Sequence, residues 1–321
     1  MKRFVVDVMI PTYKPGQEFE ELLPRLLKQS YPIRSICVVN TGAAYWNPKW
    51  EQLSPKIRVE HIRPSEFDHG GTRAAMAESS NADLILFMTQ DAIPADEFLV
   101  EHLVEKFMLP HVKAAYARQL PKEDCRTLER FTRSFNYPSE SDIKDYGDLP
   151  KMGVKTFFCS NVCAVYDRRV YEELGGFVRH TPFNEDMIYA GHLVQAGYAI
   201  AYAADAKVFH SHNYGCIAQL KRNFDLGASQ AMHPEIFKKY PSEGEGMKMV
   251  KLSAGHVIKI HRPWLLVPLF FQSAFKYLGY LLGKHYRSLP DRLILFCTSN
   301  KTWWEYRLTM SDRRRKRKTA G

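Results

Sequence analysis

The feature that most constrains this chain is a short apolar run that stops at a single carboxylate. Residues 84–88 read LILFM, without polar alternation, and Asp91 follows shortly after. Such a run is typical of a strand covered on both faces of a mainly parallel sheet, which predicts an α/β fold. Ligands of open α/β sheets bind beyond the carboxyl ends of the strands, where a carboxylate can hold a cation and, through it, phosphate. The structural alternative is that Asp91 caps the turn before Pro94.

The composition is that of a globular protein. The 321 residues are 45% hydrophobic and 25% charged, enough for one large core or two smaller ones. Met1-Lys-Arg runs directly into a strand-like segment, so we expect no signal peptide. The six cysteines form no C-x-x-C pair, which indicates reduced thiols in a cytoplasmic protein.

Strand and helix patterns alternate through the first hundred residues. Strands are predicted at 5–10, 34–40, 57–62 and 84–88, and helices at 19–29 and 74–80. This alternation predicts a Rossmann-like, mainly parallel sheet with helices on both faces, so that Asn40, a Gly70-Gly71 turn and Asp91 share one edge. The chain contains no G-x-G-x-x-G fingerprint and no P-loop, which argues against dinucleotide oxidoreductases and ATPases.

The next hundred residues continue this pattern less regularly. A helix is predicted at 95–107, a strand at 113–119, and a long mobile loop over a site at 120–155, where the chain is polar and interrupted by prolines. A buried strand at 156–166 is broken in the middle by Ser160 and Asn161. A helix at 168–174 ends at two glycines, and a strand at 199–202 follows.

Two polar clusters late in this region are candidate functional groups. Asn184 can cap a helix that carries Glu185 and Asp186 in its first turn, where acids also simply complement the helix dipole. His210 and His212 fall on the same face if their segment is extended, which suits a metal site. Pairs of histidines are also common on solvated strand edges.

Five motifs occur in order between residues 5 and 215. They are Ile10-Pro-Thr-Tyr13, Val38-Val-Asn40, the helix-opening loop Phe67–Arg73, Thr89-Gln-Asp91, and Gly175-Gly-Phe177 followed by Glu185-Asp186. Together they resemble the inverting glycosyltransferases of family two, which have the GT-A fold. That family usually has Asp at position 40 and a D-x-D triplet at 89–91. The departures here, with FDHGGTR at 67–73 and HSHNY at 210–214, resemble the rhamnosyltransferase branch that builds bacterial surface polysaccharides.

The resemblance implies a single displacement from a nucleotide diphospho-sugar, with dTDP-rhamnose as the expected donor and an α-rhamnoside as the product. Asp186 is then the base that deprotonates the acceptor hydroxyl, and Glu185 orients it or contacts the acceptor. Asp91, with His212 or His210, is expected to bind Mg²⁺ or Mn²⁺, which meets the charge on the leaving diphosphate. A single carboxylate in the triplet is also compatible with weak metal dependence.

The resemblance also assigns residues to the two substrates. The nucleotide-sugar residues are Pro11, Thr12, Tyr13, Asn40, Asp68, His69, Arg73, Gln90 and Asp91, and the acceptor residues are Ser160 and Asn161. Tyr13 is a candidate to pack against the base, and Asn40 offers amide groups to a thymine or uracil edge. Arg73 is expected to reach the base or the diphosphate, with a helix-surface salt bridge as the structural alternative.

The domain prediction places a GT-A domain at 1–215, with a nucleotide-sugar half at 1–118 and an acceptor half at 119–215. A helical extension follows at 216–321. Within it, residues 263–282 are about as long as a membrane span, but Gln272, Lys276, Gly279 and Gly283 make a polar or small stripe. We expect an amphipathic helix in the cytoplasmic leaflet, assisted by Trp303-Trp304 and the basic cluster 313–318. The alternatives are a helix packed on the catalytic domain and a true span.

A peripheral position at the inner face of the cell membrane suits a glycan acceptor carried on polyprenyl diphosphate. The formal net charge is +10, and six of the positive charges fall in 313–318. This cluster raises nucleic-acid binding as a rival, but no nucleic-acid module occurs, so no nucleic-acid partner is expected. A second rival is a non-catalytic membrane scaffold of the same fold, against which the retained Asp91, Glu185 and Asp186 argue.

Overall fold

The computed structural model describes residues 3–319. The basic cluster predicted to assist membrane binding, 313–318, lies outside the residues whose side chains are described. The chain forms two compact units. The first comprises Met1–Arg63, Gly71–Arg179 and Glu185–Asn213, and the second comprises Pro64–Gly70, His180–Asn184 and Tyr214–Gly321.

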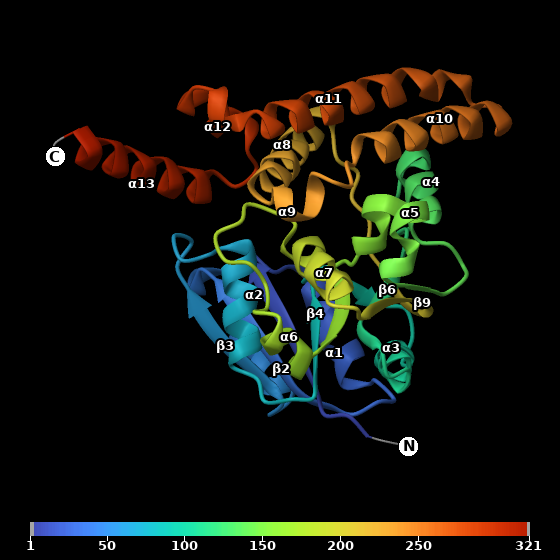
Figure 1. Ribbon diagram of the computed structural model, residues 1–321. Coiled ribbons are helices and arrows are strands. Elements are labelled where there is room, and N and C mark those ends of the chain that lie inside the picture. The colour runs from blue at the N-terminus through green and yellow to red at the C-terminus, as the bar shows by residue number, and fades with distance from the viewer. Residues whose placement is uncertain (1–2, 320–321) are drawn as a thin grey trace. The chain divides into compact units, whose positions relative to one another are not determined.

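The first unit is built on one sheet, which has nine strands within the described residues (Figure 1). The strands are β1 (Val6–Tyr13), β2 (Ile33–Thr41), β3 (Ile57–Ile62), β4 (Leu84–Met88), β5 (Ile93–Pro94), β6 (Val112–Leu120), β7 (Asp142–Lys144), β8 (Cys163–Asp167) and β9 (Ala199–Phe209). Their order is β3-β2-β1-β4-β8-β6-β9-β5, with β7 also on β9. The pairs among β1–β4 and the β6–β9 pair are parallel, whereas β8, β5 and β7 pair antiparallel. The predicted α/β class with a mostly parallel sheet is confirmed.

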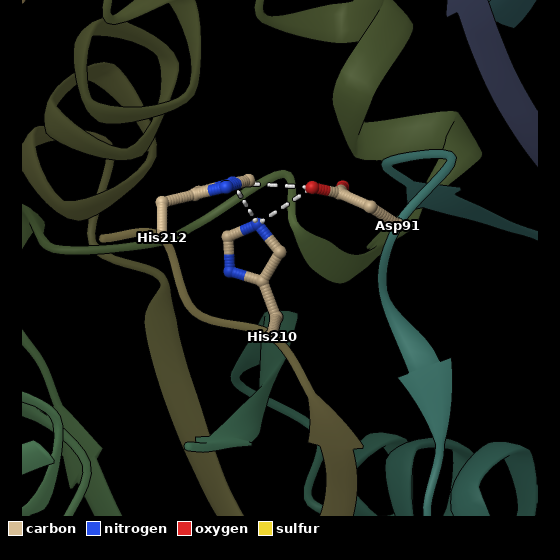
Figure 2. A group of neighbouring side chains, drawn as sticks. All are labelled: Asp91, His210 and His212. Atoms are coloured by element: carbon tan, nitrogen blue, oxygen red, sulfur yellow. Dashed lines mark hydrogen bonds and ion pairs between the residues drawn. The ribbon is translucent and has the colours of Figure 1, made fainter. Parts of the chain in front are cut away.

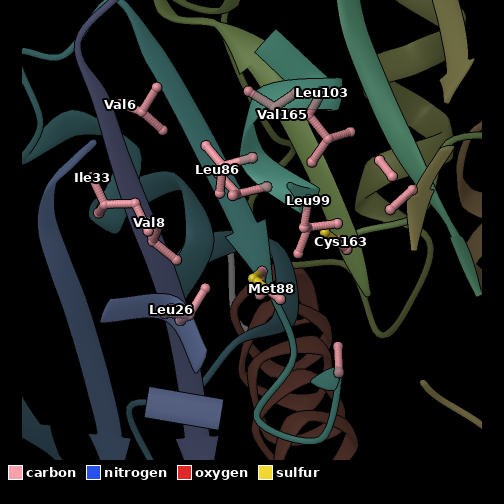
Figure 3. Close-up of a cluster of buried hydrophobic side chains, with 14 of the residues drawn as sticks. Val6, Val8, Leu26, Ile33, Leu86, Met88, Leu99, Leu103, Cys163 and Val165 are labelled. Carbon is pink, nitrogen blue, oxygen red and sulfur yellow. The ribbon is translucent and has the colours of Figure 1, made fainter. Parts of the chain in front are cut away.

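The described helices that accompany the sheet are α1 (Gln17–Leu27), α2 (His69–Glu78), α3 (Leu99–Glu105), α4 (Thr127–Asn136), α5 (Leu149–Met152), α6 (Arg168–Glu173) and α7 (Glu185–Gln195). Helices α1 and α3 pack on one face of the sheet, and α6 and α7 pack on the other. Successive strand residues point to opposite faces, so Leu86 of β4 joins the core that contains Leu99 of α3 (Figure 3). The next residue, Phe87, packs on Phe177, whose ring centroid also lies 5.7 Å from that of Tyr189 in α7.

The prediction of a long loop at 120–155 is wrong. This region contains α4, β7, the 3-10 helix Tyr146–Asp148 and α5. Its prolines delimit elements: Pro138 follows the end of α4, and Pro150 stands in the first turn of α5, where a missing N–H costs nothing. A polar, proline-interrupted sequence is therefore here a series of short elements.

Three predicted boundaries also differ. Of the strand predicted at 156–166, residues 156 and 157 end the 3-10 helix Gly153–Phe157, residues 158–162 are in neither helix nor strand, and β8 begins only at Cys163. The strand predicted at 199–202 continues to Phe209 because β6 pairs with it along that length. The predicted Gly70-Gly71 turn lies inside α2, which begins at His69.

The second unit is mainly helical, as predicted. Its helices are α8 (Cys216–Met232), α9 (Pro234–Phe237), α10 (Glu243–Lys259), α11 (Leu266–Lys284), α12 (Asp291–Cys297) and α13 (Lys301–Thr319), with 3-10 turns at Pro263–Leu265 and Tyr286–Ser288. Trp303 and Trp304, predicted to assist membrane binding, are instead buried in its core. The indole N–H of Trp304 donates to the fully buried carboxylate of Asp225, which also accepts from the Thr298 hydroxyl.

The small residues predicted as a stripe on α11 form its contact with α8. A Cβ atom added at Gly279 would lie 2.1 Å from the carbonyl oxygen of Leu220, and one at Gly283 would lie 2.1 Å from that of Phe224. Any side chain at these positions would force the helices apart. The stripe is therefore a close helix-packing face.

Candidate active site

The turn after β4 brings Asp91 to the end of β9. The chain turns between Thr89 and Ala92 and enters β5, which pairs antiparallel with β9 so that Ile93 lies opposite Phe209. His210 is the next residue after Phe209. The carboxylate and both predicted histidines therefore meet at one place (Figure 2).

The three side chains converge closely. Oδ2 of Asp91 lies 3.1 Å from Nε2 of His212 and 3.5 Å from Nε2 of His210, and the two Nε2 atoms are 3.0 Å apart. His210 is buried, while Asp91 and His212 are half-buried. The cluster is thus held by the protein and still reachable from solvent.

Gln119, at the end of β6, orients His210. Its Oε1 lies 3.0 Å from Nδ1 of His210 and also accepts a hydrogen bond from Arg133, while its Nε2 donates to the Ser160 hydroxyl at 3.1 Å. An amide oxygen can only accept, so Nδ1 of His210 carries the proton. The lone pair of the neutral ring is then on Nε2, which faces Asp91 and His212. We did not predict Gln119 or Arg133; the only signal for Gln119 was its place at the end of a predicted strand.

The protonation states suit a cation site. Burial lowers the pKa of His210 to about 4, so the ring is neutral at pH 7. Burial alone would raise the pKa of Asp91, but hydrogen bonds with His210 and His212 outweigh it and hold that pKa well below its usual range. The cluster therefore combines a carboxylate with two imidazole nitrogens.

These groups fit a divalent cation. Two ligand atoms, each roughly 2.1 Å from one ion, lie about 3 Å apart when they subtend a right angle. Two of the three observed separations, 3.0 and 3.1 Å, match this spacing, and the third, 3.5 Å between Asp91 and His210, corresponds to a wider angle at the ion.

A second cluster surrounds the acids that open α7. The backbone N–H of Asn161 donates to Oδ2 of Asp186 at 3.0 Å, and its side-chain amide donates to Oε1 of Glu185 at 3.2 Å. Asn161 itself is buried, and the hydroxyl of Tyr166 donates to its Oδ1. The break at Ser160-Asn161 thus places one residue that binds both carboxylates.

Arg73 of α2 completes this cluster. Its guanidinium lies 3.1 Å from Oε1 of Glu185, and both side chains are less than one-tenth exposed. The guanidinium of Arg73 therefore forms a salt bridge with a carboxylate of the protein. This agrees with the structural alternative given for Arg73, except that the salt bridge is buried and does not lie on the surface of the helix. Burial and the negative charge of Glu185 raise the pKa of Asp186 to about 7. The hydrogen bond from the backbone of Asn161 and the positive charge of Arg73 lower it, but they do not offset the rise.

The ends of β1 and β2 are tied together by Asn40. Its Oδ1 accepts from the Thr12 hydroxyl at 3.0 Å, and its Nδ2 donates to the Gly42 carbonyl at 3.0 Å and lies 3.1 Å from Nδ1 of His61. Asn40 is fully buried, and these contacts use both of its amide hydrogens. An aspartate would lack these donors, which gives a physical reason for asparagine where the family usually has aspartate.

Tyr13 stands exposed at the end of β1. The side chain of Gln90 binds its backbone on both sides, accepting from the N–H at 2.8 Å and donating to the carbonyl at 3.1 Å. This ties the end of β1 to the turn that carries Asp91. The Tyr13 ring packs edge-on against Tyr45, an aromatic residue that we did not predict, and Lys14 lies over both rings.

Three further residues predicted to bind the nucleotide sugar are Pro11, Asp68 and His69. Pro11 is buried within β1, opposite Val39 of β2. Asp68 and His69 belong to the second unit. There, Oδ1 of Asp68 accepts from the backbone N–H of His180 at 3.2 Å, and the ring of His69 packs against Phe67 and Phe183.

Comparison with known proteins identifies the family. Residues 7–175, more than half of the chain, match the family model of Glycosyl transferase family 2. The chain belongs to this family. The O-antigen chain rhamnosyltransferase RfbN of Salmonella typhimurium (strain LT2) is 38% identical over 93% of this chain and 96% of its own length. The O-antigen chain rhamnosyltransferase WbaN of Salmonella anatum is 41% identical over 92% and 95%. The protein is therefore a glycosyltransferase of family 2.

A solved structure supports the fold assignment. The mannosyltransferase PcManGT from Pyrobaculum calidifontis, in complex with GDP-Man and Mn²⁺, superposes with a TM-score of 0.62 and 14% sequence identity, covering 90% of this chain and 89% of its own. The family 2 enzyme described here has the predicted GT-A fold.

Proposed function

We propose that this enzyme transfers rhamnose from dTDP-rhamnose to a hydroxyl of a glycan acceptor during synthesis of a bacterial surface polysaccharide. The observation that carries the proposal is the identity of 38% and 41%, over nearly the whole chain, to two proteins named as O-antigen chain rhamnosyltransferases. The cation cluster and the buried acid pair supply the chemistry that such a transfer needs.

The nucleotide sugar is assigned to the ends of β1, β2 and β4, in residues 1–118. Tyr13 is exposed there and offers a ring for the base. Asp91, His210 and His212 would hold Mg²⁺ or Mn²⁺. When bound, the cation supplies positive charge next to the leaving diphosphate. Gln119 and Gln90 keep these groups in place, the first through His210 and the second by fixing the end of β1.

The acceptor is assigned to residues 119–215, with Asp186 as the base. The acceptor oxygen attacks the anomeric carbon from the face opposite the diphosphate, and its proton passes to Asp186. The new C–O bond forms as the bond to the phosphate oxygen breaks, so a β-linked donor gives an α-rhamnoside. A pKa raised toward neutrality strengthens the carboxylate as a base. Glu185, bound by Arg73 and Asn161, orients the start of α7.

The acceptor class extends the same proposal. A growing glycan carried on polyprenyl diphosphate would be reached by an enzyme working in the cytoplasm, peripherally at the inner face of the membrane. The apolar segment Pro263–Lys284, of which only 11% is buried inside the protein, supports a location at a membrane surface.

The test is transfer of label from dTDP-[¹⁴C]rhamnose to lipid-linked glycans extracted from bacterial membranes. We expect labelled glycolipid with Mg²⁺ or Mn²⁺ present, an α-configured product by NMR, and loss of turnover in Asp186→Asn, whose folding is checked by thermal unfolding. Unchanged turnover in Asp186→Asn would overturn the role of the base. Transfer from a different nucleotide sugar alone would overturn the donor, and no transfer from any donor would favour the non-catalytic scaffold.

A further inference from the structure

Helix α11 presents an apolar face that its own unit leaves uncovered. This outer face consists of Val267, Phe270, Phe271, Tyr277 and Leu278 of α11 together with Trp264 of the preceding 3-10 turn, and these residues are between 48% and 67% exposed. Phe270 and Phe271 lie three and four residues after Val267, and Tyr277 and Leu278 follow them by seven residues, or about two helical turns, so these side chains share one side of the helix. A stripe of this size on a soluble surface indicates a binding site.

The opposite side of α11 cannot take this role, because it is fixed to α8. Gly279 and Gly283 are buried there, with backbone carbonyls of α8 filling the space that a side chain would need. This contact sets the rotation of α11, so the same stripe always faces away from α8. A helix anchored along one side to a protein surface offers an apolar face, whereas a helix that crosses a bilayer alone is apolar all round.

The charges around this face favour an anionic surface. From Glu243 to Lys284 the chain carries five lysines and one arginine against two glutamates, both of which stand in the first turn of α10. Several of these side chains, including Lys251, Lys259 and Arg262, are exposed. The alternative occupant of this face is a second copy of the chain. Dimerisation through the face would bring two positively charged hairpins together, and their repulsion disfavours it. Anionic lipid headgroups instead complement the lysines and arginines, and Trp and Tyr rings prefer the same boundary.

We propose that the hairpin of α10 and α11 is a membrane-docking surface whose outer face lies in the headgroup region of an anionic bilayer, with α11 parallel to the membrane plane. Helices of this kind bury their apolar face roughly 5–10 Å deep. This inference rests on the proposed function in one respect, namely that docking would bring the enzyme close to a lipid-linked acceptor. The docking itself requires neither donor nor acceptor.

Vesicle flotation of the purified full chain tests the proposal. We expect it to float with vesicles of phosphatidylcholine and phosphatidylglycerol and to float poorly with phosphatidylcholine alone. The double variant Phe270→Asp/Phe271→Asp should lose binding by about tenfold or more. Lys251→Glu should weaken it by about fivefold or more, since each lysine near an anionic surface contributes about 1 kcal/mol. The matched control Phe98→Asp, at an exposed phenylalanine of the first unit, should float like wild type.

Three results would overturn the proposal. One is equal flotation of wild type and the double variant, or no flotation of either. Another is resistance of the bound protein to alkaline carbonate extraction, which would show a spanning helix. The third is a dimer in solution that the double variant dissociates. The rise in unfolding midpoint on adding the nucleotide sugar separates membrane docking from the proposed function. The double variant should keep this rise. Asp91→Ala should lose the rise but still float with the vesicles.

Discussion

Oδ2 of Asp91 lies 3.1 Å from Nε2 of His212, although the two residues come from segments far apart in the chain. The pairing of β5 with the end of β9 creates this contact. Together with His210, it gives the strand ends a set of ligand atoms of the kind that divalent cations bind. The donor half of the proposed reaction depends on this relationship.

Gln119→Leu should weaken Mn²⁺ binding by about 10- to 100-fold, although Gln119 is not itself one of the converging ligands. The substitution removes the acceptor that holds the proton of His210 on Nδ1, so Nε2 is no longer fixed as a lone pair. Isothermal titration with MnCl₂ measures the effect. Gln119→Glu retains an acceptor and should bind more tightly than the leucine variant. Equal affinities for wild type and Gln119→Leu would show that the tautomer is set elsewhere.

The pH dependence of kcat/KM should report Asp186. A base acts only when deprotonated, and the pKa of Asp186 is raised to about 7. Activity should therefore be full above this pH and fall as the pH drops through it, well before an ordinary aspartate would titrate. Rates measured from pH 5 to 9 provide the profile.

Glu185→Gln gives this profile its control. The charge of Glu185 is one of the causes that raise the pKa of Asp186, so its removal should move the acidic limb to lower pH. Arg73→Met should move the limb the other way, because the guanidinium favours the ionised form of Asp186. An acidic limb that neither substitution moves belongs to another group.

Arg73→Met should also lower the free energy of unfolding by about 3–5 kcal/mol, because it leaves the buried carboxylate of Glu185 without its ion pair. Urea denaturation at pH 7 measures the loss. The matched control is Arg179→Met, which breaks the exposed pair with Glu78 and should cost less than about 1 kcal/mol. Similar losses in the two variants would argue against a buried, paired charge at position 73.

Gly279→Ala and Gly283→Ala should each destabilise the protein by about 1–3 kcal/mol, because the new methyl group meets a carbonyl of α8. Gly255→Ala is the control, since a Cβ there meets nothing within 4 Å in the middle of α10. It should stabilise the protein by up to about 1 kcal/mol through helix propensity. Thermal unfolding of the three variants compares them. A neutral Gly279→Ala would show that α8 and α11 do not approach this closely.

The sequence predicted those parts of the fold that depend on local patterns. The apolar run 84–88 was predicted as a strand and forms β4. Glu185 and Asp186 were predicted in the first turn of a helix, where acids are favoured, and they form the first turn of α7. His210 and His212, predicted to share one face of an extended segment, do meet, although both lie beyond the end of β9 at Phe209. These features need only the chain's own spacing.

Local sequence patterns could not predict contacts between residues that are far apart in the chain. Asn40 contacts Thr12 and Arg73 contacts Glu185, and both contacts join residues far apart in the chain; the assignment of Asn40 and Arg73 to the nucleotide sugar stays a prediction. Gln119 became a support for His210 only through the parallel register of β6 and β9. Likewise, the burial of Trp304 depends on Asp225 accepting its indole N–H, which no local pattern reveals.

The most direct test of the central claim is the thermal unfolding midpoint of the purified protein with a panel of nucleotide sugars, each with and without Mn²⁺. A ligand at 100 times its Kd stabilises the native state by about 2.7 kcal/mol, so binding is visible without any acceptor. The account predicts that dTDP-rhamnose gives the largest rise, that Mn²⁺ enhances it, and that Asp91→Ala abolishes it. No rise with any nucleotide sugar in folded protein, or a larger rise with a different sugar, would contradict it.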